Sequence, residues 1–133
     1  MEVGDGMKPG MEIGRTETIE IKVTEDMFAN FEGYVIHPVY STVAMVYHME
    51  WVSRKIILPF LEEHEEGMGA SVEVKHIDAA PLNTKVVLTA TLTEYHNHQV
   101  ITSIKAYRDQ TLIGKGNVKQ VILPKEVIEK RIG

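Results

Sequence analysis

The chain has 133 residues, of which 44% are hydrophobic and 25% charged, as is usual for one globular domain. Its formal net charge of −5 at pH 7 argues against a general nucleic-acid binder, whose affinity depends on clustered Lys and Arg. The absence of cysteine excludes disulfides, thiolate nucleophiles and Cys-ligated zinc. Because we find neither a signal-peptide pattern nor a run of about 20 apolar residues, we expect one cytoplasmic domain over residues 1–133 that does not cross a membrane.

The first part of the chain predicts a strand followed by an irregular flap. Glycines and a proline make residues 1–15 a loose lead-in. Residues 18–23 alternate between apolar and polar side chains, which indicates a half-buried strand. Residues 24–40 carry several aromatic side chains without a clear period. We therefore expect a loop with one short helical turn that packs on another part of the molecule.

A buried helix is predicted for residues 41–58. Apolar side chains surround this segment instead of forming a stripe, and a helix of that kind is buried on most sides. Ser41 and Thr42 are the candidate N-caps, and Pro59 ends or kinks the helix. The polar run at residues 62–67 then returns the chain to the surface.

The remaining sequence predicts four strands joined by short links, at residues 69–78, 84–95, 99–108 and 111–123. Short links imply antiparallel neighbours. The order of elements predicts an α+β hot-dog fold, in which a five-stranded antiparallel sheet wraps one long buried helix; a cystatin-like fold is the alternative. One such sheet cannot cover a helix that is apolar on all sides, so we also predict a homodimer.

Two polar residues interrupt apolar surroundings. Glu50 lies in the helix that we expect to be buried, where a carboxylate is costly unless it is paired. It could instead pair with Arg54, one turn later, on a solvated edge. His76 shares one face of its strand with Val72 and Val74, and it could be an ordinary core histidine. If Glu50 and His76 both face the seam between sheet and helix, they form a candidate acid–base pair.

Thr42, Gly69 and two histidines are further candidates. Thr42 lies about 12 Å from Glu50 along the helix axis, so it would flank an extended substrate, meet groups across a dimer interface, or only cap the helix. Gly69 lets the backbone approach a ligand, although a glycine after a helix often marks a turn. His96 and His98 lack a third ligand nearby, so we predict an exposed turn there and no metal site.

Residues 39–81 contain a Thr near the helix start, the motif MEW, a Gly before the next strand and the motif HxxAAP. This combination resembles the fluoroacetyl-CoA thioesterase-like branch of the hot-dog thioesterases. The resemblance implies a catalytic set of Thr42, Glu50 and His76, with Gly69 near the thioester carbonyl. It also implies a homodimer with the active site at the subunit interface.

The resemblance further implies an aromatic lid before the helix and an Arg near the end of the last strand, where this chain has Gln120. The predicted lid and acyl-pocket residues are Phe31, Tyr34, Ile36, Met45, Met49 and Gln120. We expect hydrolysis of a small or medium acyl-CoA, with Glu50 as general base or nucleophile and no cofactor beyond the CoA of the substrate. One alternative is a non-catalytic acyl-CoA or lipid-binding protein. The other is a hot-dog hydratase, which is less favoured because the sequence has no Asp-x-x-x-x-His run.

Overall fold

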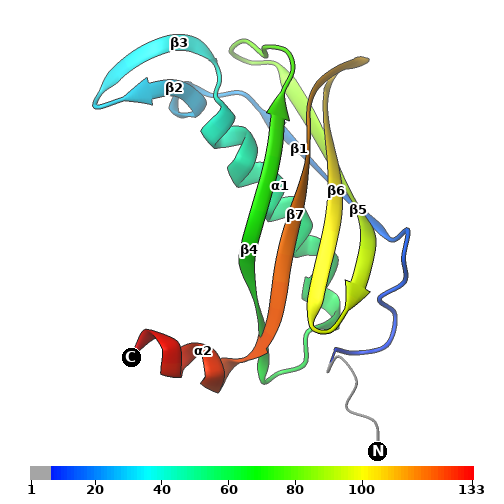
Figure 1. The fold of residues 1–133 in the computed structure, drawn as a ribbon. Helices are drawn as coiled ribbons and strands as arrows, with labels where there is room; N and C mark the ends of the chain where they lie inside the picture. Colours follow the sequence, from blue (N-terminus) through cyan, green and yellow to red (C-terminus); the bar gives the residue numbers. More distant parts are fainter. Residues whose placement is uncertain (1–6) are drawn as a thin grey trace, which may run out of the picture.

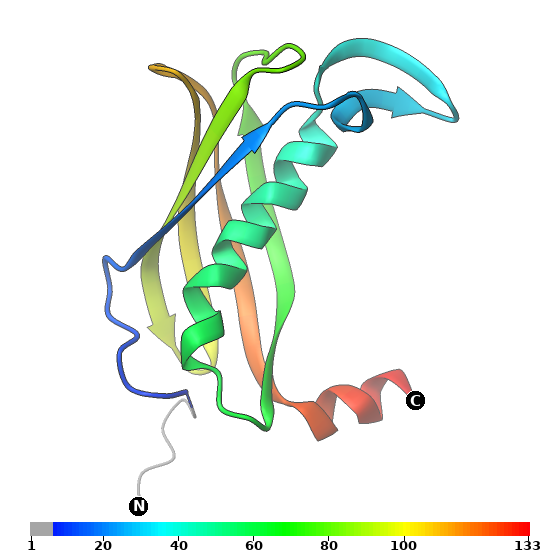
Figure 2. The same cartoon turned by 180° about the vertical axis from the view of Figure 1, so that it is seen from behind.

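The computed structural model describes residues 7–133, which form a curved antiparallel sheet packed against one long helix (Figures 1 and 2). The helix α1 spans Thr42–Ile57 and lies across the concave face of the sheet. The strands follow the order β1-β5-β6-β7-β4, with bounds β1 Thr16–Lys22, β5 Lys85–His96, β6 Gln99–Arg108, β7 Thr111–Pro124 and β4 Glu65–His76. The predicted five-stranded sheet is confirmed, and β4, the strand that follows α1, is one of its free edges.

The ends of α1 follow from local sequence. The Ser41 side chain caps the helix by accepting a hydrogen bond of 3.0 Å from the Ala44 N–H. Arg54 and Lys55 lie in the last turn, where they complement the helix dipole. Because Ser41 is the cap, Thr42 is the first helical residue and its hydroxyl is available for another partner.

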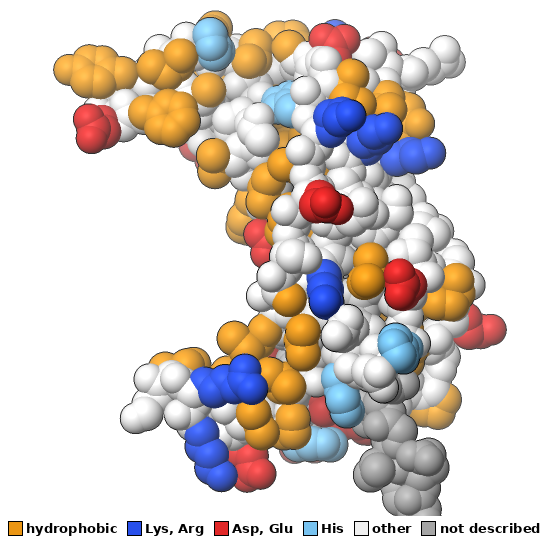
Figure 3. Space-filling model, viewed as in Figure 1, with side chains coloured by type: hydrophobic (Ala, Val, Ile, Leu, Met, Phe, Trp, Pro, Cys, Tyr) orange, Lys and Arg blue, Asp and Glu red, His pale blue; other side chains and the backbone are white. Residues whose placement is uncertain are grey.

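The prediction that α1 is buried on most sides is wrong for one copy of the chain. Its apolar residues Met45, Met49 and Val52 pack on the sheet, but Val43 and Tyr47 on the opposite side are 71% and 65% exposed. Figure 3 shows that this side faces a hollow with hydrophobic side chains around it. A surface of this kind on a single chain indicates that something covers it.

Residues 24–40 form a hairpin instead of a loop. The predicted helical turn is present at Glu25–Met27, and it is followed by β2 (Phe28–Phe31) and β3 (Tyr34–Tyr40). Gly33 makes the turn with a φ of 85°, a conformation that glycine adopts without steric cost. We call residues 28–40 the flap; it projects beyond the start of α1 (Figure 1).

Two further differences concern the start of β4 and the C-terminal end of the chain. The strand β4 begins at Glu65, so Gly67 and Gly69 lie inside it and not in a turn. A short helix that the sequence did not predict, α2 (Lys125–Ile132), projects from the opposite end of the molecule to the flap (Figures 1 and 2). Of the predicted lead-in, residues 1–6 lie outside the described part, while residues 7–15 hold no helix or strand.

Within residues 7–133, no helix has the length and apolar character needed to cross a membrane.

Candidate active site

Thr42 and His76 meet where α1 begins and β4 ends. The Oγ1 atom of Thr42 lies 2.8 Å from Nδ1 of His76. His76 is half-buried and belongs to the helix-facing side of β4, as the alternation with Val72 and Val74 predicted. The hydrogen bond to Thr42 holds one nitrogen of the imidazole and thereby orients the other. The interpretation of Thr42 as the helix cap is wrong, because Ser41 has that role.

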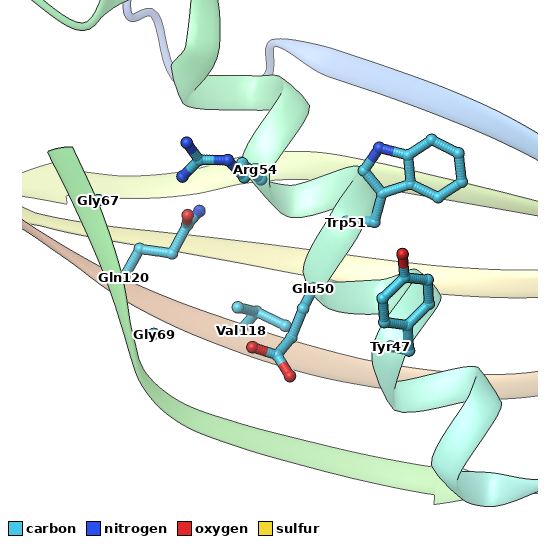
Figure 4. A pocket seen from close by; sticks show the side chains of 8 residues that line it. All are labelled: Tyr47, Glu50, Trp51, Arg54, Gly67, Gly69, Val118 and Gln120. Atoms are coloured by element: carbon cyan, nitrogen blue, oxygen red, sulfur yellow. The ribbon is translucent and has the colours of Figure 1, made fainter.

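Glu50 lies further along α1, in a groove of about 360 Å³ between the helix and the start of β4. The groove is lined by Tyr47, Glu50, Trp51, Arg54, Gly67, Gly69, Val118 and Gln120 (Figure 4). The carboxylate of Glu50 faces Gly69 so closely that a Cβ atom added to Gly69 would lie 3.3 Å from Oε1 of Glu50. Glu50 is exposed in one copy of the chain, so the expectation of a buried carboxylate is wrong.

Arg54 does not pair with Glu50, contrary to the simpler interpretation of the sequence. Its guanidinium lies 2.8 Å from the carboxylate of Glu66 in β4. Burial raises the pKa of Glu66, but hydrogen bonds from the Gly67 N–H and from Arg54 outweigh it and hold that pKa below its usual range. The ion pair fixes Arg54 at the end of the groove, and the carboxylate of Glu50 stays free to act on a ligand.

A β-bulge brings Gly69 to face Glu50. Along β4, His76, Val74 and Val72 face the helix, and strict alternation would put Ala70 on the same side. The pairing with β7 shifts between Gly69 and Ser71, so Ala70 is the extra residue of a bulge. Beyond the bulge, Gly69 pairs with the buried Gln120 and shares its helix-facing side.

Gln120 forms part of the floor of this groove. Its side chain is buried, and Nε2 donates a hydrogen bond of 3.1 Å to the carbonyl oxygen of Ser53. A fixed amide therefore occupies the position where the family resemblance implies an Arg.

A second cavity, of about 800 Å³, lies between the flap and the first turns of α1. Phe28 and Phe31 of the flap line it, together with Thr42, Tyr47 and His48 of the helix. We call it the flap cavity. Since Tyr47 also lines the Glu50 groove, the two cavities adjoin along one face of α1.

The other four lid and acyl-pocket candidates lie on the flap and in the core. Tyr34 and Ile36 are exposed on the flap, at 74% and 52%. Met45 and Met49 are fully buried in the core, where their sulfur atoms approach Gly114 and Gly116 of β7. Of the six predicted residues, Phe31 lines the flap cavity and Gln120 lines the groove.

Sequence reasoning did not identify Tyr40 and His48 as part of the site. The phenol oxygen of Tyr40 lies 2.8 Å from Nδ1 of His48, and both side chains are buried. Burial lowers the pKa of His48, which keeps the ring neutral at pH 7. The available signal was a histidine within an apolar helix, eight residues after an aromatic residue that precedes the N-cap.

Within one copy of the chain, the predicted pair of Glu50 and His76 does not form. The separation is about 12 Å along α1 between Thr42 and Glu50, and roughly 20 Å along β4 between Gly69 and His76. Each copy therefore carries two half-sites, one built on Thr42 and His76 and the other on Glu50 and Gly69.

His96 is the last residue of β5, His98 lies in the turn that follows, and both are exposed. In the part of the chain that the structure describes, no three His, Asp or Glu side chains are grouped so that they could hold a metal ion.

Comparison with known proteins identifies the family. The profile of the fluoroacetyl-CoA-specific thioesterases matches residues 23–126. The chain belongs to this family. The fluoroacetyl-CoA thioesterase of Streptantibioticus cattleyicolor is 25% identical to it over 132 residues, which cover 95% of each chain.

Solved structures agree with this assignment. A Thermus thermophilus protein described as a thioesterase superfamily member is 40% identical, with a TM-score of 0.90 over 93% of this chain and 92% of that chain. A hot-dog-like protein from Thermanaerovibrio acidaminovorans is 22% identical, with a TM-score of 0.86 over 99% of this chain and 95% of that chain. At this identity the similarity supports the fold only. The predicted hot-dog fold and the resemblance to the fluoroacetyl-CoA thioesterase branch are confirmed, and this member of the family is an acyl-CoA thioesterase.

Proposed function

We propose that this thioesterase hydrolyses a small or medium acyl-CoA to the free acid and CoA, using Thr42, Glu50 and His76. The observation that carries the proposal is the pair of half-sites: a Thr–His hydrogen bond of 2.8 Å and a carboxylate that faces a backbone glycine. A thioester hydrolase needs a base for water, a proton donor for the leaving sulfur and a donor to the oxyanion. The two half-sites supply these groups.

We propose that a second copy of the chain brings the two half-sites together. The free edge of β4 can pair with the β4 of another copy, and the two strands then run antiparallel about a two-fold axis. With that axis near the middle of β4, the His76 end of one strand lies beside the Gly69 end of the other. Thr42 and His76 would then act with the partner subunit's Glu50.

The exposed side of α1 supports this dimer. Val43, Tyr47 and Trp51 of α1 are exposed in one copy of the chain. Figure 3 shows hydrophobic side chains around a hollow in the molecule. Two copies related by the proposed axis would each cover this side of the other. A homodimer therefore accounts both for the separated half-sites and for the apolar surface.

The proposed chemistry is a direct attack of water. The carboxylate of Glu50 takes a proton from a water molecule whose oxygen bonds to the thioester carbonyl carbon. The N–H of Gly69 stabilises the oxyanion that forms. When the C–S bond breaks, His76 gives its proton to the sulfur of CoA, and Thr42 holds the imidazole in position. Glu50 then loses its proton to solvent, His76 regains one, and the reaction uses no cofactor beyond the CoA of the substrate.

The flap cavity is the proposed acyl pocket. It adjoins Thr42, and its aromatic wall of Phe28 and Phe31 suits an apolar chain. A volume of about 800 Å³, partly open to solvent, supports a small or medium acyl group.

The direct test is thiol release from acyl-CoAs of increasing chain length, for the wild type, Glu50→Gln and His76→Ala. We expect each variant to lose on the order of 10²–10⁴-fold in kcat, as expected when a proton-transfer group is removed. His96→Ala, at the exposed end of β5, is the matched control and should retain activity. If acyl-CoA binds but no substrate releases thiol, the protein is a binder and the proposal is wrong.

Sedimentation analysis tests the dimer separately. The chain has a mass of 15.0 kDa, so a dimer sediments as a species of twice that mass. A stable monomer at the concentrations used for the assay would contradict the shared site.

A further inference from the structure

A ladder of rings runs from the Glu50 groove to His76. The Tyr40 ring stacks on His48, with centroids 5.8 Å apart and an interplanar angle of 18°. Tyr40 also contacts the His76 ring, with centroids 6.4 Å apart and an interplanar angle of 68°. His48 in turn contacts Tyr47 at 5.3 Å and Trp51 at 6.3 Å. The imidazole of His76 is therefore the last ring of a packed series.

The middle of the ladder is a buried polar pair. Tyr40 is fully buried and His48 is 5% exposed, and the hydrogen bond of 2.8 Å links the Tyr40 phenol to Nδ1 of His48. Burial raises the pKa of Tyr40 and lowers that of His48, so both groups are neutral at pH 7. A neutral, hydrogen-bonded pair avoids the cost of an unsatisfied polar group in the core.

Filling the core does not require this pair. Two apolar side chains of similar shape would occupy the same space without any polar group to satisfy. The hydrogen bond adds direction: it holds the phenol end of Tyr40, and the Tyr40 ring contacts the His76 ring in an edge-to-face arrangement. Thr42 holds His76 from another side through Nδ1.

We propose that Tyr40 and His48 are positioning residues that fix the orientation of the His76 imidazole for proton transfer to the leaving sulfur. This inference rests on the role proposed for His76. Tyr40 packs against the imidazole and is assigned no contact with substrate. His48 acts on His76 through Tyr40, and it also lines the flap cavity. Proton transfer depends on the placement of the donor within a fraction of an ångström, and a shift of about 1 Å costs on the order of 10²-fold in rate.

The test uses Tyr40→Phe, which removes only the phenol oxygen, and His48→Phe, which removes the other partner and keeps a ring. We expect kcat to fall about 3–10-fold in each variant, as for a displacement of a fraction of an ångström. KM should stay unchanged in Tyr40→Phe, because Tyr40 does not line the flap cavity. The double variant should be no worse than the more impaired single variant, because the two residues act as one unit. Nitrogen NMR of the imidazole rings should show a changed tautomer ratio for His76.

Ile104→Val is the matched control, because it trims a fully buried core residue of β6 that the site does not use. It should lower stability and leave both kcat and the His76 signals unchanged. Tyr40→Phe and His48→Phe variants that keep the wild-type kcat and His76 signals would overturn the inference and make the pair purely structural. Full activity of His76→Ala would overturn the proposed function instead, and the NMR signals would still report whether the pair orients His76.

Discussion

A methyl group at position 69 should slow hydrolysis without destabilising the protein. In Gly69→Ala, the new Cβ atom would lie 3.3 Å from Oε1 of Glu50, which is closer than an ordinary contact, so the carboxylate must move by a few tenths of an ångström. A catalytic group that is misplaced by about 1 Å lowers the rate on the order of 10²-fold. A shift of the Glu50 carboxylate by a third to a half of this distance therefore predicts a loss of about 4–10-fold in kcat.

The effect on stability should have the opposite sign. Gly69 is not among the residues with positive φ, so alanine can adopt the same backbone conformation. Replacing such a glycine restricts the unfolded chain and typically raises the free energy of unfolding by about 0.4–1 kcal/mol. Thiol release and thermal unfolding should therefore be measured on the same preparation.

Gly67→Ala provides the contrast. There the added Cβ atom would lie 2.5 Å from Cδ1 of Ile57, a fully buried core residue, so the expected result is a lower Tm. If Gly69→Ala keeps the wild-type kcat, Glu50 does not work against Gly69, and the assignment of this half-site is wrong. If its Tm falls together with its activity, the loss reports folding and the geometric argument fails.

Three other changes probe the same architecture. Thr42→Val removes the hydroxyl that holds His76 and should reduce kcat about 10–100-fold, whereas Thr42→Ser should restore most of it; equal rates for Val and Ser would contradict the role of the hydroxyl. Because burial lowers the pKa of His48 in the folded state, protonation of His48 favours the unfolded chain. The free energy of unfolding should therefore fall as the pH drops below about 6.5. Urea titrations at pH 7 and pH 5 should show a smaller fall for His48→Phe than for the wild type. Gly114→Ala would place a Cβ atom 2.4 Å from Sδ of Met45, so we expect a loss of about 1–3 kcal/mol in unfolding free energy; an unchanged value would show that Met45 repacks freely.

The regular elements were predictable because their signals are local. The strands β5, β6 and β7 alternate cleanly between short turns, and their observed ends lie within one residue of the predicted ones. The ends of α1 are set by Ser41 and Pro59, which act within a single turn. The flap hairpin has an irregular register, so it shows no period that the sequence could reveal. The helix α2 is short and rich in Lys and Glu, and no side-chain cap marks its start.

The candidate site was predictable in identity but not in arrangement. A polar residue among apolar neighbours is visible in the sequence, and this drew attention to Glu50 and His76. The distance between Glu50 and His76 depends on how α1 packs against β4, which the sequence does not reveal. The side of β4 on which Gly69 lies depends on the bulge at Ala70, which has no local sequence signature. Glu50 was predicted to be buried because Met49 and Trp51 beside it are apolar, yet only Met49 is in the core, and Trp51 is 44% exposed in one copy of the chain.

Mixing two inactive variants tests the central claim most directly. Glu50→Ala and His76→Ala subunits are unfolded together, refolded at equal concentration and assayed for thiol release. If each site uses His76 of one subunit and the partner subunit's Glu50, every mixed dimer carries one intact site. Random pairing then restores about a quarter of the wild-type activity. Activity that stays at the level of the separate variants would contradict the shared site and place both residues of each site in the same chain.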